Sequence, residues 1–442
     1  MDYLLPLIHP ADTFSSTRGE GQVEGASQPK STLEYSKAGQ KPTDTDQKMK
    51  SSVDLGCEGD ASRTAVIDPH LGLILSWCRL HVKRVCCIPV RKNFFIWSIA
   101  VWLALPVVGQ VPAWGIGPFT RPVGINPIIV PSTNSLFECP MTKTSVEWEA
   151  GHTFNPAAVV KDGKVFVIYR AEDNSGAAMI GGHTSRLGLA ESDDGLHFHR
   201  FAEPVLFPAE DGQKANEWPG GCEDPRLVEG EDGTFILLYT QWNRKIPQLA
   251  TATSRDLVHW TKQGAALTNY VGPSKSGAIV CKISDDRLKA AKINGKYWMY
   301  WGEGIILCAS SGDLIHWDAG LSGLPPRRGK FDSALAEAGP PAVLTDRGIV
   351  LLYNGKNDPD TGDASLPPNV YSDGQALFDA NDPWHLLERT EHPFFQPEMP
   401  FERTGQYGGG TTFIEGLVWL HRKWFLYYGC ADSFVGVAES GN

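Results

Sequence analysis

The sequence lacks the patterns that would build a metal centre or a disulfide framework. Its nine cysteines include no CxxC pair and no cysteine–histidine spacing typical of zinc sites. The histidines are scattered along the chain and form no cluster with ligand spacing. We therefore expect no metal and no cofactor. No Asn-x-Ser/Thr acceptor occurs either, so the sequence gives no sign of N-glycosylation.

Positive charge is also scarce. The 442 residues carry a net charge of −11, which argues against nucleic acid as a partner because a phosphate backbone needs a basic face. What the chain has instead is 42% hydrophobic residues, 14 Trp, 12 Tyr and 46 Gly. This composition favours a turn-rich β protein whose sites use aromatic side chains.

Long hydrophobic runs are limited to one short segment near the N-terminus. Residues 1–92 are mostly polar, and we expect a disordered or low-order region there. Residues 93–110 contain the apolar run 94–108, preceded by Arg91 and Lys92, which is short for a spanning helix and suits a signal-peptide core. It is either an uncleaved anchor, the only membrane contact we expect, or evidence that the first ninety residues are absent from the natural product. We expect residues 111–442 to be a secreted or membrane-anchored catalytic domain outside the cytosol.

A repeated hairpin organises residues 111–442. Five segments share a turn followed by an apolar run that ends in an aromatic or glycine-containing cluster: DGK-VFVIYRA at 162, DGT-FILLYT at 232, NGK-YWMYWG at 294, DRG-IVLLYNG at 346 and HRK-WFLYYG at 421. Asp-Gly and Asn-Gly between apolar runs are strong hairpin signals. Four of the five also show the first strand of the hairpin.

A third strand follows most hairpins, as in LGLAESDDGLHF, LATATSRDLVHW and ILCASSGDLIHW. Five units of short strands predict an all-β, five-bladed β-propeller. A β-sandwich is the alternative, but it does not explain five similar units. Trp260 and Trp317 end two of these third-strand segments, and we expect them to pack within blades rather than contact sugar.

Hairpin geometry predicts one shared mouth, because the start of each first strand and the end of each second strand lie at the same end. Carboxylates, amides and aromatic side chains gather there and suit a carbohydrate pocket. The candidates are Asn155, Arg170, Asp173, Glu223, Asp224, Arg226, Asn243, Arg244, Glu303, Asp332, Glu337, Tyr353, Asn354 and Asp432.

The stretch Trp218–Arg226 (WPGGCEDPR) is the most distinctive of these candidates. Proline is tolerated at the first residue of a strand, so Asp224 is expected at the mouth of a strand, beside Arg226. A carboxylate held there suits acid–base or sugar-binding work. The alternative is an ordinary Asp-Pro turn with a surface ion pair.

The order of FNPAAV, YRAED, GCEDPR, KSGAIV, EAGPP, LLYNGK and YYGCAD resembles glycoside hydrolase family 130, from about Trp114 to Asn442. The resemblance implies a five-bladed propeller acting on β-mannosides, either as a phosphorylase or as an inverting mannosidase. It implies that Asp224 is the general acid, relaying its proton through a mannose hydroxyl. It also implies that Asn155, Arg170, Asp173 and Asp432 hold the mannosyl residue.

The residues that face the nucleophile favour water over phosphate. The resemblance implies that Glu303 and Glu337 stand where the family's phosphorylases carry a basic element and an uncharged residue, and carboxylates repel phosphate. Arg244, Lys275 and Lys292 remain as candidate phosphate ligands.

We expect inverting hydrolysis of a β-mannoside, β-1,2-linked as the resemblance implies, with Asp224 as acid and Glu303 or Glu337 as base. The expected partner is a mannose-containing oligosaccharide. A phosphorylase of the same fold and a non-catalytic glycan-binding propeller are the alternatives.

Overall fold

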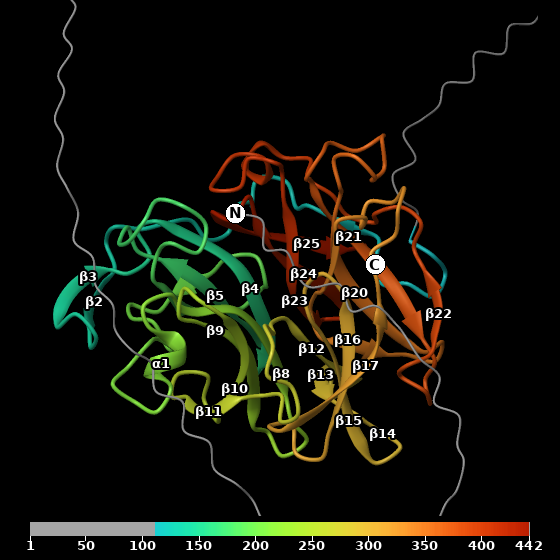
Figure 1. Ribbon diagram of the computed structural model, residues 1–442, viewed down its shortest axis with the longest axis horizontal. Coiled ribbons are helices and arrows are strands. Elements are labelled where there is room, and N and C mark those ends of the chain that lie inside the picture. The colour runs from blue at the N-terminus through green and yellow to red at the C-terminus, as the bar shows by residue number, and fades with distance from the viewer. Residues whose placement is uncertain (1–110, 442) are drawn as a thin grey trace, which may run out of the picture. The chain divides into compact units, whose positions relative to one another are not determined.

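The computed structural model describes residues 111–441, which are built almost entirely from antiparallel β-strands (Figure 1). The predictions for residues 1–92 and 93–110 lie outside these described residues. Within the described part, no helix is long and apolar enough to cross a membrane.

The five predicted hairpins are present, and their turns explain why they form. Asp162–Gly163 and Asn294–Gly295 have positive φ at both positions, which gives the turn whose twist matches that of the flanking strands. His421 and Arg422 adopt the same conformation without a glycine. The hairpin signals in the sequence are therefore confirmed.

The strands pair in five successive groups, numbered here in chain order. Group 1 contains β4 (His152–Lys161), β5 (Lys164–Glu172), β6 (Ser185–Ser192) and β7 (His199–Arg200). Group 2 contains β8 (Gly221–Glu229), β9 (Phe235–Trp242), β10 (Pro247–Ser254) and β11 (Thr261–Ala265).

The remaining groups follow the same order with small changes. Group 3 contains β12 (Gly277–Ser284), β15 (Lys296–Trp301), β16 (Ile306–Ser311) and β17 (Trp317–Leu324), with β13 (Arg287–Ala290) and β14 (Lys292–Ile293) inserted between its first two strands. Group 4 contains β18 (Leu335–Ala338), β19 (Ala342–Leu344), β20 (Ile349–Lys356), β21 (Tyr371–Phe378) and β22 (Leu386–Arg389).

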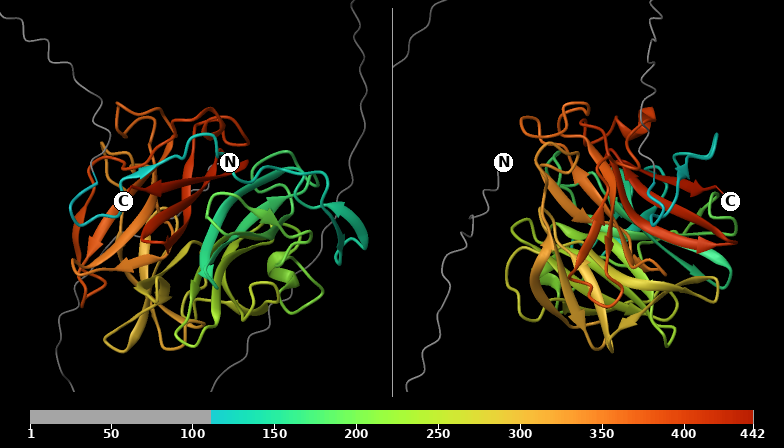
Figure 2. Two further views of the ribbon diagram at one scale, coloured as in Figure 1. Left: turned by 180° about the vertical axis from the view of Figure 1, so that it is seen from behind. Right: turned by 90° about the vertical axis from the view of Figure 1, so that its right-hand side faces the viewer.

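Group 5 takes its outer strand from the opposite end of the described chain. It contains β23 (Thr412–Leu420), β24 (Lys423–Cys430) and β25 (Phe434–Ser440), and β25 pairs with β1 (Phe119–Thr120). Figures 1 and 2 show the early segment running beside these last strands. The sequence contains no pattern that predicts this pairing.

Alternating side chains of each inner strand pack against two different neighbouring groups. Ala157 and Val159 of β4 belong to a cluster shared with group 2, whereas Ala158 and Val160 belong to one shared with group 5. Three further clusters join groups 2 and 3, 3 and 4, and 4 and 5. The groups therefore follow one another in a closed circle, with a hydrophobic layer between each pair. This packing explains why the strands read as continuous apolar runs.

The three clearest third-strand repeats each end in a turn with the same hydrogen bonds. Asp194, Asp256 and Asp313 each accept two backbone N–H groups through Oδ1 and contact a histidine Nδ1 at 2.8 Å through Oδ2. The repeat seen in the sequence is thus a repeat of hydrogen bonds. Outside the five groups lie the hairpin of β2 (Leu136–Cys139) and β3 (Thr144–Glu147), the short helix α1 (Lys214–Glu217) and the 3-10 turn η1 (Pro400–Glu402).

Candidate active site

Irregularities in the first strands aim polar side chains at the mouth. The register of β4 shifts at Asn155, that of β8 at Asp224, and that of β23 at Glu415. Asn155 and Asp224 have φ of 49° and 46°, a left-handed conformation that is uncommon for non-glycine residues. Bulges of this kind re-aim a side chain beside a functional site. All three residues are buried.

Asp224 is held by three side chains, two from group 1 and one from the start of group 3. Its Oδ1 accepts hydrogen bonds from Asn155 Nδ2 at 2.8 Å and from Arg170 Nη1 at 3.1 Å. Its Oδ2 lies 3.2 Å from Lys275 Nζ, and Lys275 lies two residues before the start of β12. Burial raises the pKa of Asp224, but Lys275, Arg170 and Arg226 outweigh it and hold that pKa well below its ordinary value.

The pKa of Glu223, the neighbour of Asp224, is shifted in the opposite direction. Its Oε1 lies 2.9 Å from Arg170 Nη2 and accepts a hydrogen bond from Ser185 Oγ at 3.1 Å. Burial, together with the charges of Asp224 and Glu172, raises the pKa of Glu223 to about 7 despite the nearby Arg170. The adjacent pair therefore titrates as a unit that retains one proton up to about neutral pH.

Glu337 forms the facing side of the cluster. Its Oε1 accepts a hydrogen bond from Ser276 Oγ and lies 3.3 Å from Lys275 Nζ. Burial, and then the charge of Glu303, raise the pKa of Glu337 to about 7, against the lowering effect of Lys275 and Arg226. Glu303 itself is exposed, in the turn between β15 and β16.

Lys275 links the two sides of the site. Burial alone would lower the pKa of its ammonium group, but Glu303, Glu337 and Asp224 raise it well above its ordinary value. One ammonium thus contacts a carboxylate oxygen of Asp224 and one of Glu337, which places these oxygens at most about 6.5 Å apart. The two oxygens are thus no farther apart than the shortest carboxyl separation typical of inverting glycosidases, about 6.5 Å. The Lys275 side chain remains 19% exposed, so the bridge is open to solvent.

Arg226 supports the cluster from behind. Its Nη1 lies 2.9 Å from Glu415 Oε1, and its Nη2 donates to the Ala338 carbonyl at 2.8 Å. It also donates to the backbone carbonyl of Asp224 at 3.2 Å. The buried Arg226 therefore connects groups 2, 4 and 5, and its guanidinium group contacts other protein groups.

Asp432 completes the cluster from group 5. It has a φ of 51° in the turn between β24 and β25. Burial raises its pKa to about 6; Arg170 lowers it, while Asp224 and Glu172 raise it. Six predicted residues, Asn155, Arg170, Glu223, Asp224, Glu337 and Asp432, thus come together, with Glu303 influencing them from the exposed turn.

Several other predicted residues serve separate networks. Asp173 pairs with Arg186 at 2.7 Å. Asp332 accepts a hydrogen bond from Tyr353 at 2.7 Å and pairs with Arg327 and Arg389. Asn354 exchanges two hydrogen bonds with the backbone of Ile414, which joins group 4 to group 5.

Three predicted residues make no contact with the Asp224 cluster. Asn243 accepts the backbone N–H groups of Lys245 and Ile246 and so stabilises its own loop. Arg244 lies in the same turn, and its buried Nε has no hydrogen-bond partner among the described residues. Lys292 lies over the ring of Tyr297, at the hairpin end of group 3 that is opposite to Trp301. As a phosphate ligand at the mouth, Lys292 is misplaced.

The statement that the histidines form no cluster is wrong. His152, Glu172 and His183 each bring a potential ligand atom within 4.8 Å of the others. However, Glu172 already accepts hydrogen bonds from Arg170 at 2.6 Å and from Gln406 at 2.8 Å. The Arg170 guanidinium occupies the place beside this carboxylate that a cation would need, so we assign no metal to the cluster.

Glu415 was not among the predicted site residues, and Lys275 was predicted only as a candidate phosphate ligand. The inserted β13 and β14 separate β12 from the hairpin turn, so the first strand of group 3 was not recognised and Lys275 was not assigned to its start. Glu415 lies within an apparently regular strand, and only the bulge turns it toward Arg226. Had KSGAIV been recognised as the start of a first strand, hairpin geometry would have placed Lys275 at the predicted shared mouth.

Comparison with known proteins decides the family. The model of the Glyco_hydro_130 family, described as beta-1,4-mannooligosaccharide phosphorylase, matches residues 121–441. The chain belongs to glycoside hydrolase family 130. It is 33% identical to a 1,2-beta-oligomannan phosphorylase from Thermoanaerobacter sp. (strain X514), over 67% of this chain and 93% of that protein.

Solved structures of family 130 proteins are more similar. A glycosyl hydrolase from Bacteroides ovatus is 51% identical, with a TM-score of 0.73, over 75% of this chain and 96% of that one. A structure described as "The GH130 family of mannoside phosphorylases contains glycoside hydrolases that target beta-1,2 mannosidic linkages in Candida mannan" is 52% identical, with the same TM-score and coverage. The chain is thus an enzyme with a β-propeller-type fold, from a family of mannoside phosphorylases and glycoside hydrolases that act on β-mannosides.

Proposed function

We propose that the protein is an inverting hydrolase that releases mannose from β-1,2-mannosides. The observation that carries this proposal is the buried Glu337, which shares the Lys275 ammonium with Asp224. The site therefore offers a carboxyl group on each side of one small space, as single-displacement hydrolysis requires.

Glu337 is the proposed general base. A base works best when its pKa lies near the working pH, and burial brings the pKa of Glu337 to about 7. The Ser276 hydroxyl and Lys275 fix the orientation of its carboxyl group. We assign Glu303 a supporting role, because it is exposed and its charge raises the pKa of Glu337.

The proposed proton donor is the Glu223–Asp224 pair, with Asp224 as the group nearest the substrate. In the free site Asp224 is ionised and its neighbour Glu223 carries the proton, as their opposite pKa shifts indicate. Both contact Arg170, so the pair keeps one proton close to the leaving oxygen. A mannose hydroxyl between Asp224 and that oxygen would complete the relay. Asn155, Arg170 and Asp432 would bind the same mannosyl residue.

Three carboxylates also disfavour phosphate as the nucleophile. Glu303, Glu337 and Asp224 surround the Lys275 ammonium and offset its charge. Repulsion between like charges grows in a partly buried site, so a phosphate dianion would be excluded where neutral water is not. The chain is 51% identical to a structure described as a glycosyl hydrolase and 52% identical to one whose description names hydrolases of β-1,2-mannosidic linkages within the family, against 33% to the phosphorylase, and these identities support the same choice.

A mannoside phosphorylase is the second candidate. The family description and the curated relatives are phosphorylases, and the half-buried Arg244 has an unpaired Nε among the described residues.

Phosphate dependence separates the two candidates. With β-1,2-mannobiose as substrate, we expect the same rate of mannose release in phosphate-free buffer and in buffer with added phosphate. Strict dependence on phosphate, with mannose 1-phosphate as product, would establish the phosphorylase instead.

We propose a five-bladed propeller as the architecture, supported by the five strand groups and the five hydrophobic layers between them. We also propose that the enzyme acts outside the cytosol, which rests on the apolar run 94–108 alone.

A further inference from the structure

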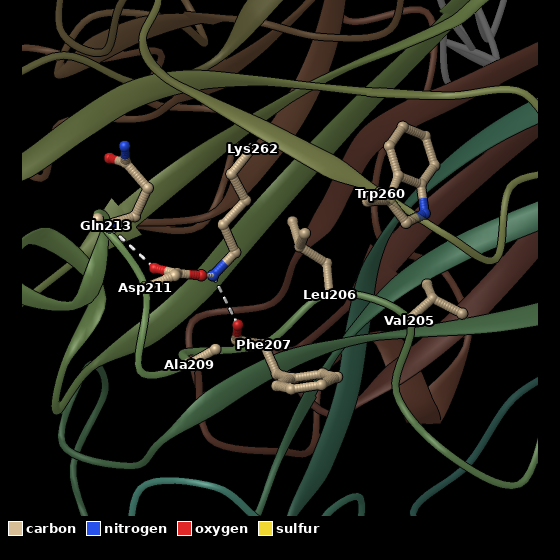
Figure 3. Close-up of a pocket in the computed structure, with 9 residues that line it drawn as sticks. Val205, Leu206, Phe207, Ala209, Asp211, Gln213, Trp260 and Lys262 are labelled. Carbon is tan, nitrogen blue, oxygen red and sulfur yellow. Dashed lines mark hydrogen bonds and ion pairs between the residues drawn. The ribbon is translucent and has the colours of Figure 1, made fainter.

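A cavity lies along the outer edge of group 2. It has a volume of about 380 Å³ and lies between β11 and the segment that connects β7 to α1 (Figure 3). Its lining residues are Val205, Leu206, Phe207, Ala209, Asp211, Gly212, Gln213, Trp260 and Lys262. None of them belongs to the Asp224 cluster. The volume is within the range of small-molecule sites.

The charge of this cavity excludes an anionic ligand. Lys262, its only lining cation, donates to the Phe207 carbonyl at 2.8 Å and pairs with Asp211 at 3.0 Å and with the buried Glu217. The Lys262 ammonium is therefore fully engaged by the protein, and two carboxylates outweigh its charge. A phosphate or carboxylate ligand would find no free cation here.

The polar groups that remain suit hydroxyl groups. Asp211 is partly exposed and can accept hydrogen bonds from a ligand. Gln213 uses its Oε1 to accept a hydrogen bond from Gln241 at 3.0 Å, which fixes the side chain. Its amide nitrogen donates to no protein acceptor within the described residues, so it remains available as a donor.

Trp260 supplies the apolar side of the cavity. Its indole Nε1 donates to the Leu257 carbonyl at 2.9 Å, which holds the ring in place. Trp317 is fully buried, as expected for blade packing, but Trp260 is only half-buried and lies with Leu206 and Val205 opposite the Asp211–Lys262 pair (Figure 3). The expectation that Trp260 serves packing alone is therefore incomplete. A fixed indole beside an acceptor and a donor matches the apolar face and hydroxyl edge of a pyranose ring.

We propose that this cavity is a second saccharide site, which binds a neutral sugar unit of a mannan chain outside the catalytic centre. The choice of mannan rests on the proposed function; the choice of a neutral sugar rests on the cavity. Binding there would hold a long chain near the enzyme between cleavage events, whereas a disaccharide would gain nothing.

Titration calorimetry with β-1,2-mannotetraose tests the proposal. The Asp224→Asn variant serves as parent, so that the saccharide is not consumed. We expect two binding sites per chain in the parent and one after the further change Trp260→Ala. Trp260→Phe should keep two sites, because it keeps a ring. Trp424→Ala, which alters a half-buried tryptophan on β24, is the matched control and should also keep two.

Kinetics with otherwise unaltered enzyme provide a second measure. Trp260→Ala and Gln213→Ala should each lower kcat/KM for long β-1,2-mannan about five- to tenfold, the effect of about 1 kcal/mol of lost binding, and leave kcat/KM for mannobiose unchanged. One site in the parent, or two sites in the Trp260→Ala variant, would overturn the proposal. If no β-mannoside is cleaved but two sites are found, the proposed function fails and the second site stands.

Discussion

At the scale of single residues, Lys275 determines how the carboxyl groups of the site share protons. Its ammonium lies 3.2 Å from Asp224 and 3.3 Å from Glu337, and it lowers the pKa of both. Arg226 also lowers both pKa values, but the two groups differ because Arg170 adds to the lowering at Asp224, whereas the charge of Glu303 opposes it at Glu337. Environments that push two carboxyl pKa values apart are what acid–base catalysis needs.

Replacing Asp224 tests its role as the group nearest the substrate. Asp224→Asn keeps the size of the side chain and should lower kcat by about 10²- to 10⁴-fold, the usual contribution of acid–base catalysis. Circular dichroism and the unfolding midpoint should change little. Turnover close to that of the unaltered enzyme would remove Asp224 from the mechanism.

The pH profile follows from the two raised pKa values. Activity should fall below pH 7 as Glu337 gains a proton, and above pH 7 as the Glu223–Asp224 pair loses its proton. We expect the pH dependence of kcat/KM to be a narrow bell-shaped curve with its maximum near neutral pH. In Lys275→Met the acid limb should move to higher pH, because removing the ammonium raises the pKa of Glu337. An acid limb that stays in place would contradict this account of Lys275.

Ionisation of the buried Glu337 should destabilise the folded protein at pH values above the pKa of this residue. Its pKa in the fold, about 7, lies above the ordinary value of 4.5, so its contribution is fully present below pH 4.5 and is lost as pH rises through 7. Between pH 5 and pH 8 the free energy of unfolding should fall by about 3 kcal/mol more in the unaltered enzyme than in Glu337→Gln. Urea denaturation at both pH values measures the difference, and equal pH dependence would contradict it.

At the scale of elements, bulges in β4, β8 and β23 explain why part of the site could be predicted and part could not. The motifs around Asn155 and Asp224 contain a proline directly after the bulged residue, which marks a strand irregularity in the sequence. Glu415 precedes a glycine, a weaker signal, and was missed. The candidates at the predicted shared mouth were chosen only by their place along a strand. That choice therefore also included Asn354 and Tyr353, whose side chains contact other parts of the protein.

The Arg226–Glu415 pair provides a test at this scale. Arg226→Met leaves the carboxylate of Glu415 buried without its partner and should destabilise the fold by about 3–5 kcal/mol. The double variant Arg226→Met/Glu415→Leu should recover much of this loss, since no buried charge remains. Urea denaturation measures both, and additive losses would show that the pair is not coupled.

At the scale of the whole molecule, local sequence signals were enough to predict the individual strand groups. They were not enough to predict the pairing of β1 with β25, which joins the two ends of the described chain. Each hairpin depends on neighbouring residues, such as Asp162–Gly163, and could be predicted from the sequence. The pairing of β1 with β25 joins residues more than three hundred positions apart, and a two-residue strand leaves almost no sequence pattern. For the same reason the sequence did not reveal that Arg121 pairs with the buried Glu402.

Gln375 tests how firmly the early segment is attached. Its buried side chain accepts a hydrogen bond from the Ile116 N–H and donates one to the Ile116 carbonyl, each at 2.8 Å. Gln375→Ala should destabilise the protein by about 1–3 kcal/mol for each of these buried groups left unpaired, with faster amide exchange in residues 115–120. Gln263→Ala, which loses only an exposed hydrogen bond, should change stability by less than about 0.5 kcal/mol. Equal effects of the two changes would show that Gln375 does not secure the closure.

The most direct test of the central claim is proton NMR of β-1,2-mannobiose during digestion, with and without phosphate. Inverting attack by water on a β-mannoside predicts α-mannose as the first product at the same rate in both buffers. Mannose 1-phosphate formed only when phosphate is present, or β-mannose as the first product, would contradict the account.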